Sequence, residues 1–130
     1  MSALRPVLLV GLGGFAGTAA RYLVGGWVHR AWPLTTFPVG TLSVNVAGCF
    51  AIGLLNGLVD ARQLFGPEAR LVLMVGVLGG FTTFSSFAYE TLSLARDAEL
   101  ARAGANVVLQ IALGLAAAWG GDALARIGPP

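Results

Sequence analysis

Four long apolar stretches dominate the chain, and short polar or charged segments separate them. The stretches run over residues 6–27, 39–59, 71–95 and 103–122. A helix that crosses the hydrocarbon core of a bilayer needs about 20 largely apolar residues. The strands of a membrane barrel would alternate apolar and polar residues, and these stretches do not. The pattern therefore predicts an all-α membrane protein, in which residues 1–130 form a single four-helix membrane domain.

The composition supports a membrane protein and excludes several other classes. Hydrophobic residues make up 56% of the chain and charged residues 11%, whereas about 25% of an ordinary soluble domain is charged. A net charge of +2 is too small and too scattered to indicate a nucleic acid partner. The single cysteine and the single histidine provide neither an internal disulfide nor a zinc site. We therefore expect the lipid bilayer, and no nucleic acid, to surround the helices.

Glycines spaced four residues apart recur in three of the stretches. The pairs are Gly13 and Gly17, Gly53 and Gly57, and Gly76 and Gly80. This spacing allows two helices to approach closely in lipid. Arg21 follows Gly17 by four residues, so the one charge deep in the first stretch is expected on the packing face. Two interpretations of Arg21 remain open: a functional or paired charge within the bilayer, or a side chain that extends its guanidinium to the bilayer surface.

The arginines of the connecting segments are divided almost evenly between the two sides of the predicted bundle. One side carries Arg5, Arg62, Arg70 and Arg126, and the other carries Arg30, Arg96 and Arg102. Because positively charged loops normally stay on the cytoplasmic side, this balance leaves the chain almost no preferred orientation. The four short helices of a single chain can also hardly enclose a polar pathway. We therefore expect a dual-topology antiparallel homodimer.

The third stretch contains a sequence that is poor for a helix. Gly79 and Gly80 are adjacent, and Thr82 and Thr83 follow after one residue. Because glycine and β-branched residues have low helix propensity, we predict a break near residues 79–83, in the middle of the membrane. A break exposes backbone carbonyls, which are tolerated there only where they face protein, water or an ion. The sequence leaves one alternative open, a continuous helix whose hydroxyls bond back to their own backbone.

Aromatic and amide side chains occur close to this break. Phe84 and Phe87 share a face of the helix that resumes after it. Such spacing is typical of packing, but the positive edge of an aromatic ring can also meet an anion. In the second stretch, Thr41 and Asn45 fall on one stripe of the helix. A buried amide needs a partner, so Asn45 either joins two helices or donates to a dehydrated anion.

Three motifs now stand in order along the chain: GGFAGTAARY at residues 13–22, PVGTLSVNVAG at residues 38–48, and GGFTTFSSF at residues 79–87 followed by Glu90. Together they resemble the Fluc-type (CrcB) bacterial fluoride channels over nearly the whole chain. The resemblance implies a fluoride-selective channel, and no enzyme, that exports fluoride passively across the bacterial inner membrane. It also implies a dual-topology antiparallel homodimer with two fluoride pathways.

The resemblance assigns roles to individual residues. The fluoride pathway would contain Asn45, Phe84 and Phe87, with Thr41, Ser85 and Ser86. The backbone carbonyls of Gly79 and Thr82 would hold a structural sodium ion that is not transported. Members of the family often carry Tyr and Ser hydroxyls along the fourth helix, whereas this chain carries Asn106 and Gln110. The polar residues left between a pathway role and a structural role are Arg21, Glu90, Asn106 and Gln110.

Two other classes of small membrane protein fit four apolar stretches. A small multidrug-type exporter would need an acidic residue inside the first span to exchange protons, but this span contains Arg21 and no acid. A non-conducting membrane assembly protein would use the glycine faces alone. It would leave Asn45 and the break without a purpose, so the sequence favours the channel.

Overall fold

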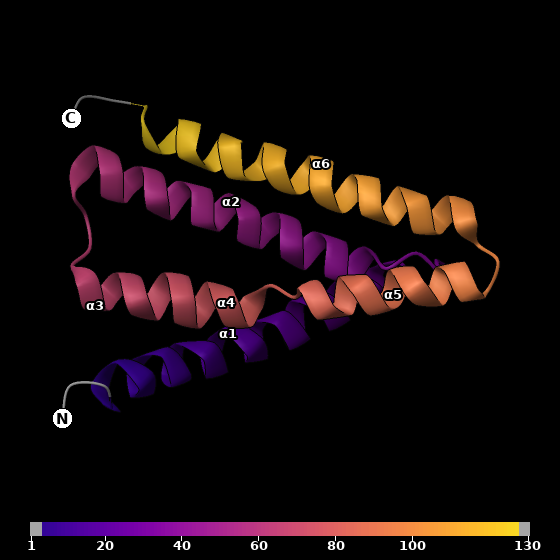
Figure 1. Ribbon diagram of the computed structural model, residues 1–130, viewed down its shortest axis with the longest axis horizontal. Helices are drawn as coiled ribbons and strands as arrows, with labels where there is room; N and C mark the ends of the chain where they lie inside the picture. The colour runs from indigo at the N-terminus through magenta and orange to yellow at the C-terminus, as the bar shows by residue number, and fades with distance from the viewer. Residues whose placement is uncertain (1–3, 128–130) are drawn as a thin grey trace.

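The computed structural model describes residues 4–127, which form helices joined by short connections (Figure 1). The elements are α1 (Leu4–Ala31), α2 (Val39–Arg62), α3 (Pro67–Arg70), the π-helical segment η1 (Leu71–Leu78), α4 (Gly79–Phe81), α5 (Phe84–Arg96) and α6 (Leu100–Ala125). Four helical units are long and apolar enough to cross a membrane: α1, α2, the combined segment Pro67–Arg96, and α6. The predicted all-α chain with four spans is therefore confirmed, and each span extends beyond the predicted limits.

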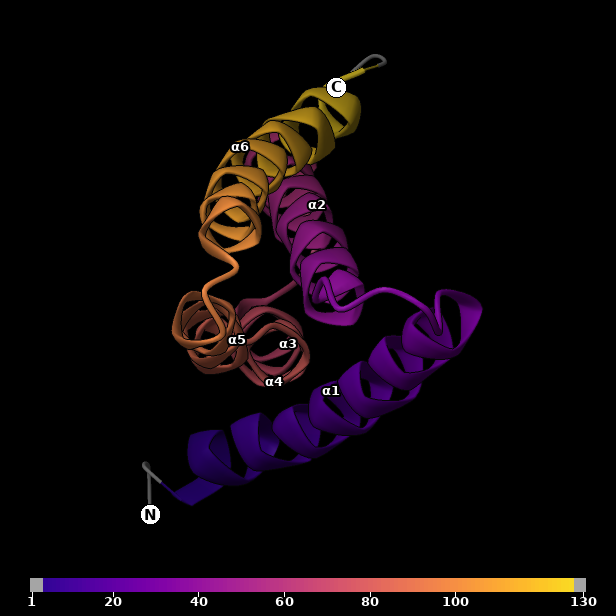
Figure 2. The ribbon, with the colours of Figure 1, turned by 90° about the vertical axis from the view of Figure 1, so that its right-hand side faces the viewer.

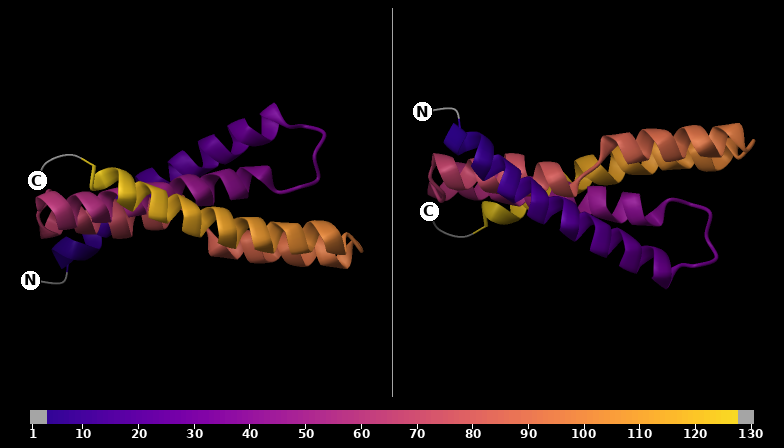
Figure 3. Two further views of the ribbon diagram at one scale, coloured as in Figure 1. Left: turned by 90° about the horizontal axis from the view of Figure 1, so that it is seen from above. Right: turned by 90° about the horizontal axis from the view of Figure 1, so that it is seen from below.

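The spans pack as two close pairs. Figure 2 shows α2 and α6 side by side, with the third span below them and α1 along its far side. Seen from below in Figure 3, α1 crosses in front of the third span. This crossing brings α1 against η1 and α4, the half of the third span that precedes the break.

The glycine pairs lie at these two interfaces. A methyl group added at Gly17 would overlap the backbone carbonyl of Val77, and one added at Gly53 would overlap that of Ala118. Gly76 and Gly80 face α1 in the same way, through Gly13 and Gly14. Because only a hydrogen atom fits between these backbones, the prediction that the glycines form helix-packing faces is confirmed.

The third span is interrupted, but at a different point from the one that its glycines suggested. Gly79 is helical, with φ −62° and ψ −38°. Thr82 and Thr83 are extended, with ψ angles of 158° and 110°, and they form the connection between α4 and α5 in Figure 1. Position 80 requires a glycine because it packs closely against α1. The helix is interrupted by the extended backbone of Thr82 and Thr83. The predicted range 79–83 is therefore right at its C-terminal end and wrong for Gly79–Phe81.

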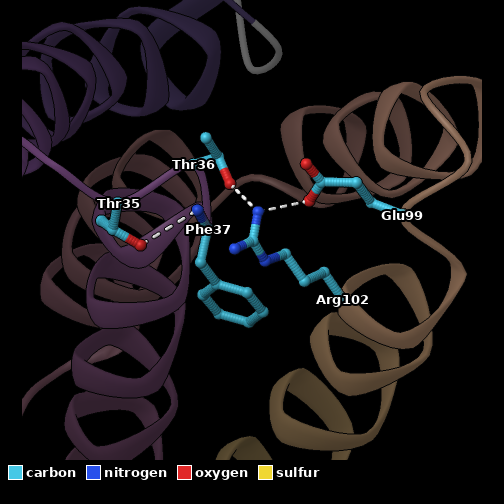
Figure 4. A network of polar contacts seen from close by, with 5 residues as sticks. All are labelled: Thr35, Thr36, Phe37, Glu99 and Arg102. Carbon is cyan, nitrogen blue, oxygen red and sulfur yellow. Dashed lines mark hydrogen bonds and ion pairs between the residues drawn. The ribbon is translucent and has the colours of Figure 1, made fainter.

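The end of the molecule near residues 32–38 is held by a small polar network (Figure 4). The Arg102 guanidinium donates to the Thr36 hydroxyl and, at 2.6 Å, to the Glu99 carboxylate. The backbone N–H of Phe37 donates to the Thr35 hydroxyl at 3.1 Å. These contacts connect the α1–α2 segment to the start of α6.

Candidate functional site

A hollow of about 410 Å³ lies beside the break in the third span. Its wall brings together six residues that the sequence singled out: Asn45, Gly79, Thr82, Phe84, Phe87 and Gln110. Most of the remaining wall is apolar, and includes Ile52, Met74, Leu78 and Ile111. We call this space the central hollow. It combines a few polar groups with an apolar lining, as small-ligand sites commonly do.

Asn45 holds the break open through its side-chain amide. Its Oδ1 accepts a 2.8 Å hydrogen bond from the backbone N–H of Thr83, and its Nδ2 donates at 3.0 Å to the Thr83 carbonyl. Nδ2 also donates at 3.1 Å to Oε1 of Gln110 in α6. Extended backbone inside a span has lost its helical partners, and buried backbone groups need replacements. Asn45 supplies them, so it joins α2, the break and α6.

The diversion of the Thr83 N–H changes the carbonyls just before the break. In a continuous helix this N–H would donate to the carbonyl of Gly79, but it donates to Asn45 instead. The Gly80 carbonyl accepts a long bond of 3.4 Å from the Thr18 hydroxyl, and the Thr82 carbonyl accepts one of 3.0 Å from Arg21. The Arg21 guanidinium is therefore directed into the protein, toward the break, and not toward the bilayer surface.

Phe84 and Phe87 lie next to each other at the start of α5. Their ring centroids are 5.3 Å apart and the ring planes meet at 67°, which is an edge-to-face arrangement. Phe84 is 78% exposed, so its ring is free to contact lipid, an ion or another chain. The prediction that these two rings share a face is confirmed.

The hydroxyl groups after the break form hydrogen bonds at the N-terminus of α5. Thr83 Oγ1 accepts from the backbone N–H of Ser86 at 3.1 Å, and so acts as the N-cap of α5. The hydroxyls of Ser85 and Ser86 lie 3.2 and 3.0 Å from the same oxygen. This capping role of Thr83 was not predicted from the sequence, although a threonine directly before a resuming helix is a recognised capping signal.

A second polar contact lies one helical turn from Asn45. The Thr41 hydroxyl donates to Oε1 of Glu90 at 2.6 Å. Glu90 also lines a separate hollow of about 240 Å³, together with Ser93, Asp97 and Glu99. Thr41 and Glu90 therefore meet each other but do not line the central hollow.

Asn106 is fully buried between α5 and α6. Its Nδ2 donates at 2.9 Å to the Thr91 hydroxyl, which in turn donates at 2.7 Å to the Phe87 carbonyl. Thr91 was missed in the sequence; its position four residues after Phe87 was the available signal. Asn106 thus supports the backbone behind the aromatic pair, whereas Gln110, one turn later in α6, reaches the central hollow.

A sequence model of the family described as CrcB-like protein, Camphor Resistance (CrcB), matches residues 8–122. This chain belongs to that family. The fluoride-specific ion channel FluC of Solibacter usitatus is 48% identical over 119 residues, which cover 92% of this chain and 97% of the relative. The FluC of Chlorobaculum tepidum is 47% identical over 124 residues, which cover 95% and 97% respectively. The fluoride-specific ion channel FluC 3 of Methanosarcina barkeri is 40% identical over 119 residues, covering 92% and 89%.

Membership of the CrcB family confirms the resemblance drawn from the three motifs. With four apolar spans, the chain is a multi-pass bacterial membrane protein. The names of these CrcB relatives describe ion channels, and an ion channel is not an enzyme.

Proposed function

We propose that this protein is a fluoride-selective ion channel that gives passive export of fluoride across the bacterial membrane. The observation that carries the proposal is the central hollow. It places the rings of Phe84 and Phe87 beside the amides of Asn45 and Gln110, at the break in the middle of a span. The names of the relatives support the same function.

The chemistry of this wall suits a small, strongly hydrated anion. The edges of aromatic rings and the N–H groups of amides are positive but carry no full charge. They can replace part of the water around fluoride without binding it too tightly for release. Thr41 and Glu90 lie one turn along, and we propose that Thr41, Ser85 and Ser86 continue the polar path from the central hollow.

The functional unit that we propose is a dual-topology antiparallel homodimer. Few large apolar side chains are buried within residues 4–127 of a single chain, and Phe84 is 78% exposed beside the central hollow. A second copy would cover this ring and complete the wall. The balanced arginines support insertion in both orientations.

We also propose a structural sodium ion held by the backbone carbonyls of Gly79 and Thr82. The diversion of the Thr83 N–H to Asn45 supports the Gly79 part of this site, because it releases the Gly79 carbonyl from its helical partner. The Thr82 carbonyl already accepts from Arg21 with one of its two lone pairs, so the second lone pair would hold the ion. Hard cations favour oxygen ligands, and carbonyls supply oxygen without burying a negative charge. Fluoride flux that stays unchanged when potassium replaces sodium throughout purification and assay would contradict the sodium site.

Ion efflux from liposomes reconstituted with the purified protein tests the function. A fluoride channel releases fluoride rapidly and chloride slowly, and needs no proton gradient. A multidrug-type exporter would instead exchange protons for organic cations, and an assembly protein would move neither. Empty liposomes are the control, and an absence of fluoride efflux above that control would contradict the proposed function.

A further inference from the structure

We propose that a hollow beside the α1–α2 connection binds the phosphate headgroup of an anionic phospholipid, and that Arg102 supplies the charge that holds it. The hollow has a volume of about 500 Å³ and is lined by residues 31–36 and by Arg102. We call it the loop hollow. It shares no residue with the central hollow, so the proposal concerns a lipid site and not the ion path.

The loop hollow lies at the level of the lipid headgroups. α1 contains 28 residues and is therefore about 42 Å long at 1.5 Å per residue, whereas the hydrocarbon core of a bilayer is about 30 Å thick. The connection that follows α1 must therefore leave the hydrocarbon within the layer of phosphates. The start of α6 lies at the same end of the molecule, because Arg102 contacts Thr36 there (Figure 4).

The rim of the loop hollow is apolar and projects from the molecule. Leu34 is 98% exposed and Trp32 is 59% exposed, and residues 31–38 contain no charge. Indole rings are typical of the headgroup level, and a leucine that lies outside the protein is stabilised by acyl chains and not by water. A phospholipid supplies both a phosphate for Arg102 and an acyl chain for this rim, whereas a free phosphate ion supplies only the first.

The charged side chains at this end are divided between two hollows. Arg102 lines the loop hollow, and Thr36 lines both hollows. The acidic residues that line the separate hollow of about 240 Å³ are Glu90, Asp97 and Glu99. In Figure 4 the guanidinium of Arg102 lies between Thr36 and Glu99. The positive group therefore faces the loop hollow, and the negative groups face the other one.

The contacts of Arg102 determine how its guanidinium is presented. Thr36 and Glu99 both accept from the same nitrogen, Nη1. They fix the group while leaving its other edge, Nε and Nη2, to form two parallel bonds with a phosphate. Arg30 is exposed directly before the residues that line the hollow. Arg30 and Arg102 carry two positive charges against the one negative charge of Glu99, and this excess favours an anionic lipid over a zwitterionic one.

Quenching of tryptophan fluorescence by brominated lipids tests the site. Trp27 and Trp119 are first replaced by Phe, which leaves Trp32 as the one tryptophan. These two side chains are 68% and 75% exposed, so little packing is lost. The full chain is reconstituted in phosphatidylcholine vesicles that contain the same small fraction of either brominated phosphatidylglycerol or brominated phosphatidylcholine. Gel filtration checks that each variant is folded.

We expect brominated phosphatidylglycerol to quench Trp32 about fivefold more effectively, since one arginine near an anionic lipid surface contributes about that factor. Arg102→Gln should remove this preference. Arg102→Lys should retain part of it, because lysine keeps the charge and loses the planar fork. Arg96→Gln is the matched control, since Arg96 is exposed at the same end and does not line the loop hollow. Inorganic phosphate in the buffer should leave the preference unchanged.

Four outcomes would overturn the proposal. They are equal quenching by the two lipids, an equal loss of preference in Arg96→Gln and Arg102→Gln, quenching by neither lipid, and release of the lipid by inorganic phosphate. Quenching by neither lipid would mean that a second copy of the chain covers Trp32, and release by phosphate would assign the hollow to a free anion. None of these measurements uses ion conduction, so their result is independent of the proposed function.

Discussion

Arg21 Nη1 in α1 donates a 3.0 Å hydrogen bond to the backbone carbonyl of Thr82, within the break of the third span. The charge that lies deepest in the first span is therefore used to hold non-helical backbone. A hydrogen bond to a charged group contributes more than one between neutral groups. This contact fastens α1 to the break, beyond the glycine interface that already joins α1 to η1 and α4.

Replacement of Arg21 should therefore loosen the break. We expect Arg21→Met to lower the free energy of unfolding by about 2 kcal/mol, since a hydrogen bond to a charged group contributes about 1.5–3 kcal/mol. Thermal unfolding in detergent measures the change. Arg30→Met, at an exposed position near the end of the same helix, is the control. An equal shift in both variants would show that the Thr82 contact contributes nothing specific.

Replacement of Asn45 should cost more than replacement of a surface amide. Asn45→Leu leaves the N–H and the carbonyl of Thr83 without partners, and each unsatisfied buried group costs about 1–3 kcal/mol. We expect a loss of about 2–6 kcal/mol on that basis, together with faster hydrogen exchange at the amide of Thr83. Asn45→Leu with normal protection of this amide would contradict the role of Asn45 in holding the break.

Adjacent glycines in α6 provide a matched test of the helix interfaces. A methyl group at Gly121 would overlap the Phe50 carbonyl of α2, whereas one at Gly120 meets nothing within 4 Å. Gly121→Ala should destabilise the protein by about 1–3 kcal/mol, as overpacking does. Gly120→Ala should leave it unchanged or stabilise it by up to about 1 kcal/mol, through helix propensity. Similar effects of the two changes on the unfolding midpoint would contradict the packing of α2 on α6.

The sequence predicts the four spans well because a bilayer imposes both their length and their apolar character. It also predicts the glycine faces, since close helix packing in lipid requires small residues. The position of the break is less predictable. Gly79 and Gly80 have low helix propensity but remain helical. At Gly80 the close packing against α1 outweighs that low propensity.

The contacts between the polar side chains could not be predicted from the sequence pattern either. Thr41 and Asn45 share a stripe of α2, yet Thr41 contacts Glu90 while Asn45 contacts Thr83 and Gln110. The partners lie 38 to 65 residues away along the chain. Only the crossing of α2 with α5 and α6 decides which polar groups meet, and periodicity within one helix carries no information about that crossing.

The orientation of the chain in the membrane can be tested directly. The near-even division of arginines predicts that both orientations coexist. A cysteine-free protein with a C-terminal tag should be labelled from both sides of the membrane in comparable amounts. Two lysines added in the 63–66 segment should shift the population to one orientation and reduce fluoride flux. If the tagged protein without added lysines is labelled from one side alone, the dual-topology dimer is contradicted.

The aromatic pair provides the test of how the central hollow handles an anion. Phe84 and Phe87 meet edge to face in the wall of the hollow, and leucine would conserve their apolar bulk without a positive ring edge. If the rings only pack, Phe84→Leu and Phe87→Leu should retain conduction and lose some stability. If the ring edges stabilise fluoride, each change should lower fluoride efflux by up to about tenfold, since an aromatic interaction contributes about 0.5–1.5 kcal/mol and about 1.4 kcal/mol corresponds to a factor of ten.

Phe81 is the internal control for this experiment. It is the last residue of α4, before the break, and it does not line the central hollow. Phe81→Leu should therefore act through stability, with fluoride efflux per assembled protein close to normal. Efflux is measured from liposomes that contain equal amounts of inserted protein, so a folding defect does not imitate a conduction defect. Normal efflux from a folded Phe84→Leu, Phe87→Leu double variant would show that the aromatic edges are not needed for fluoride to cross the membrane.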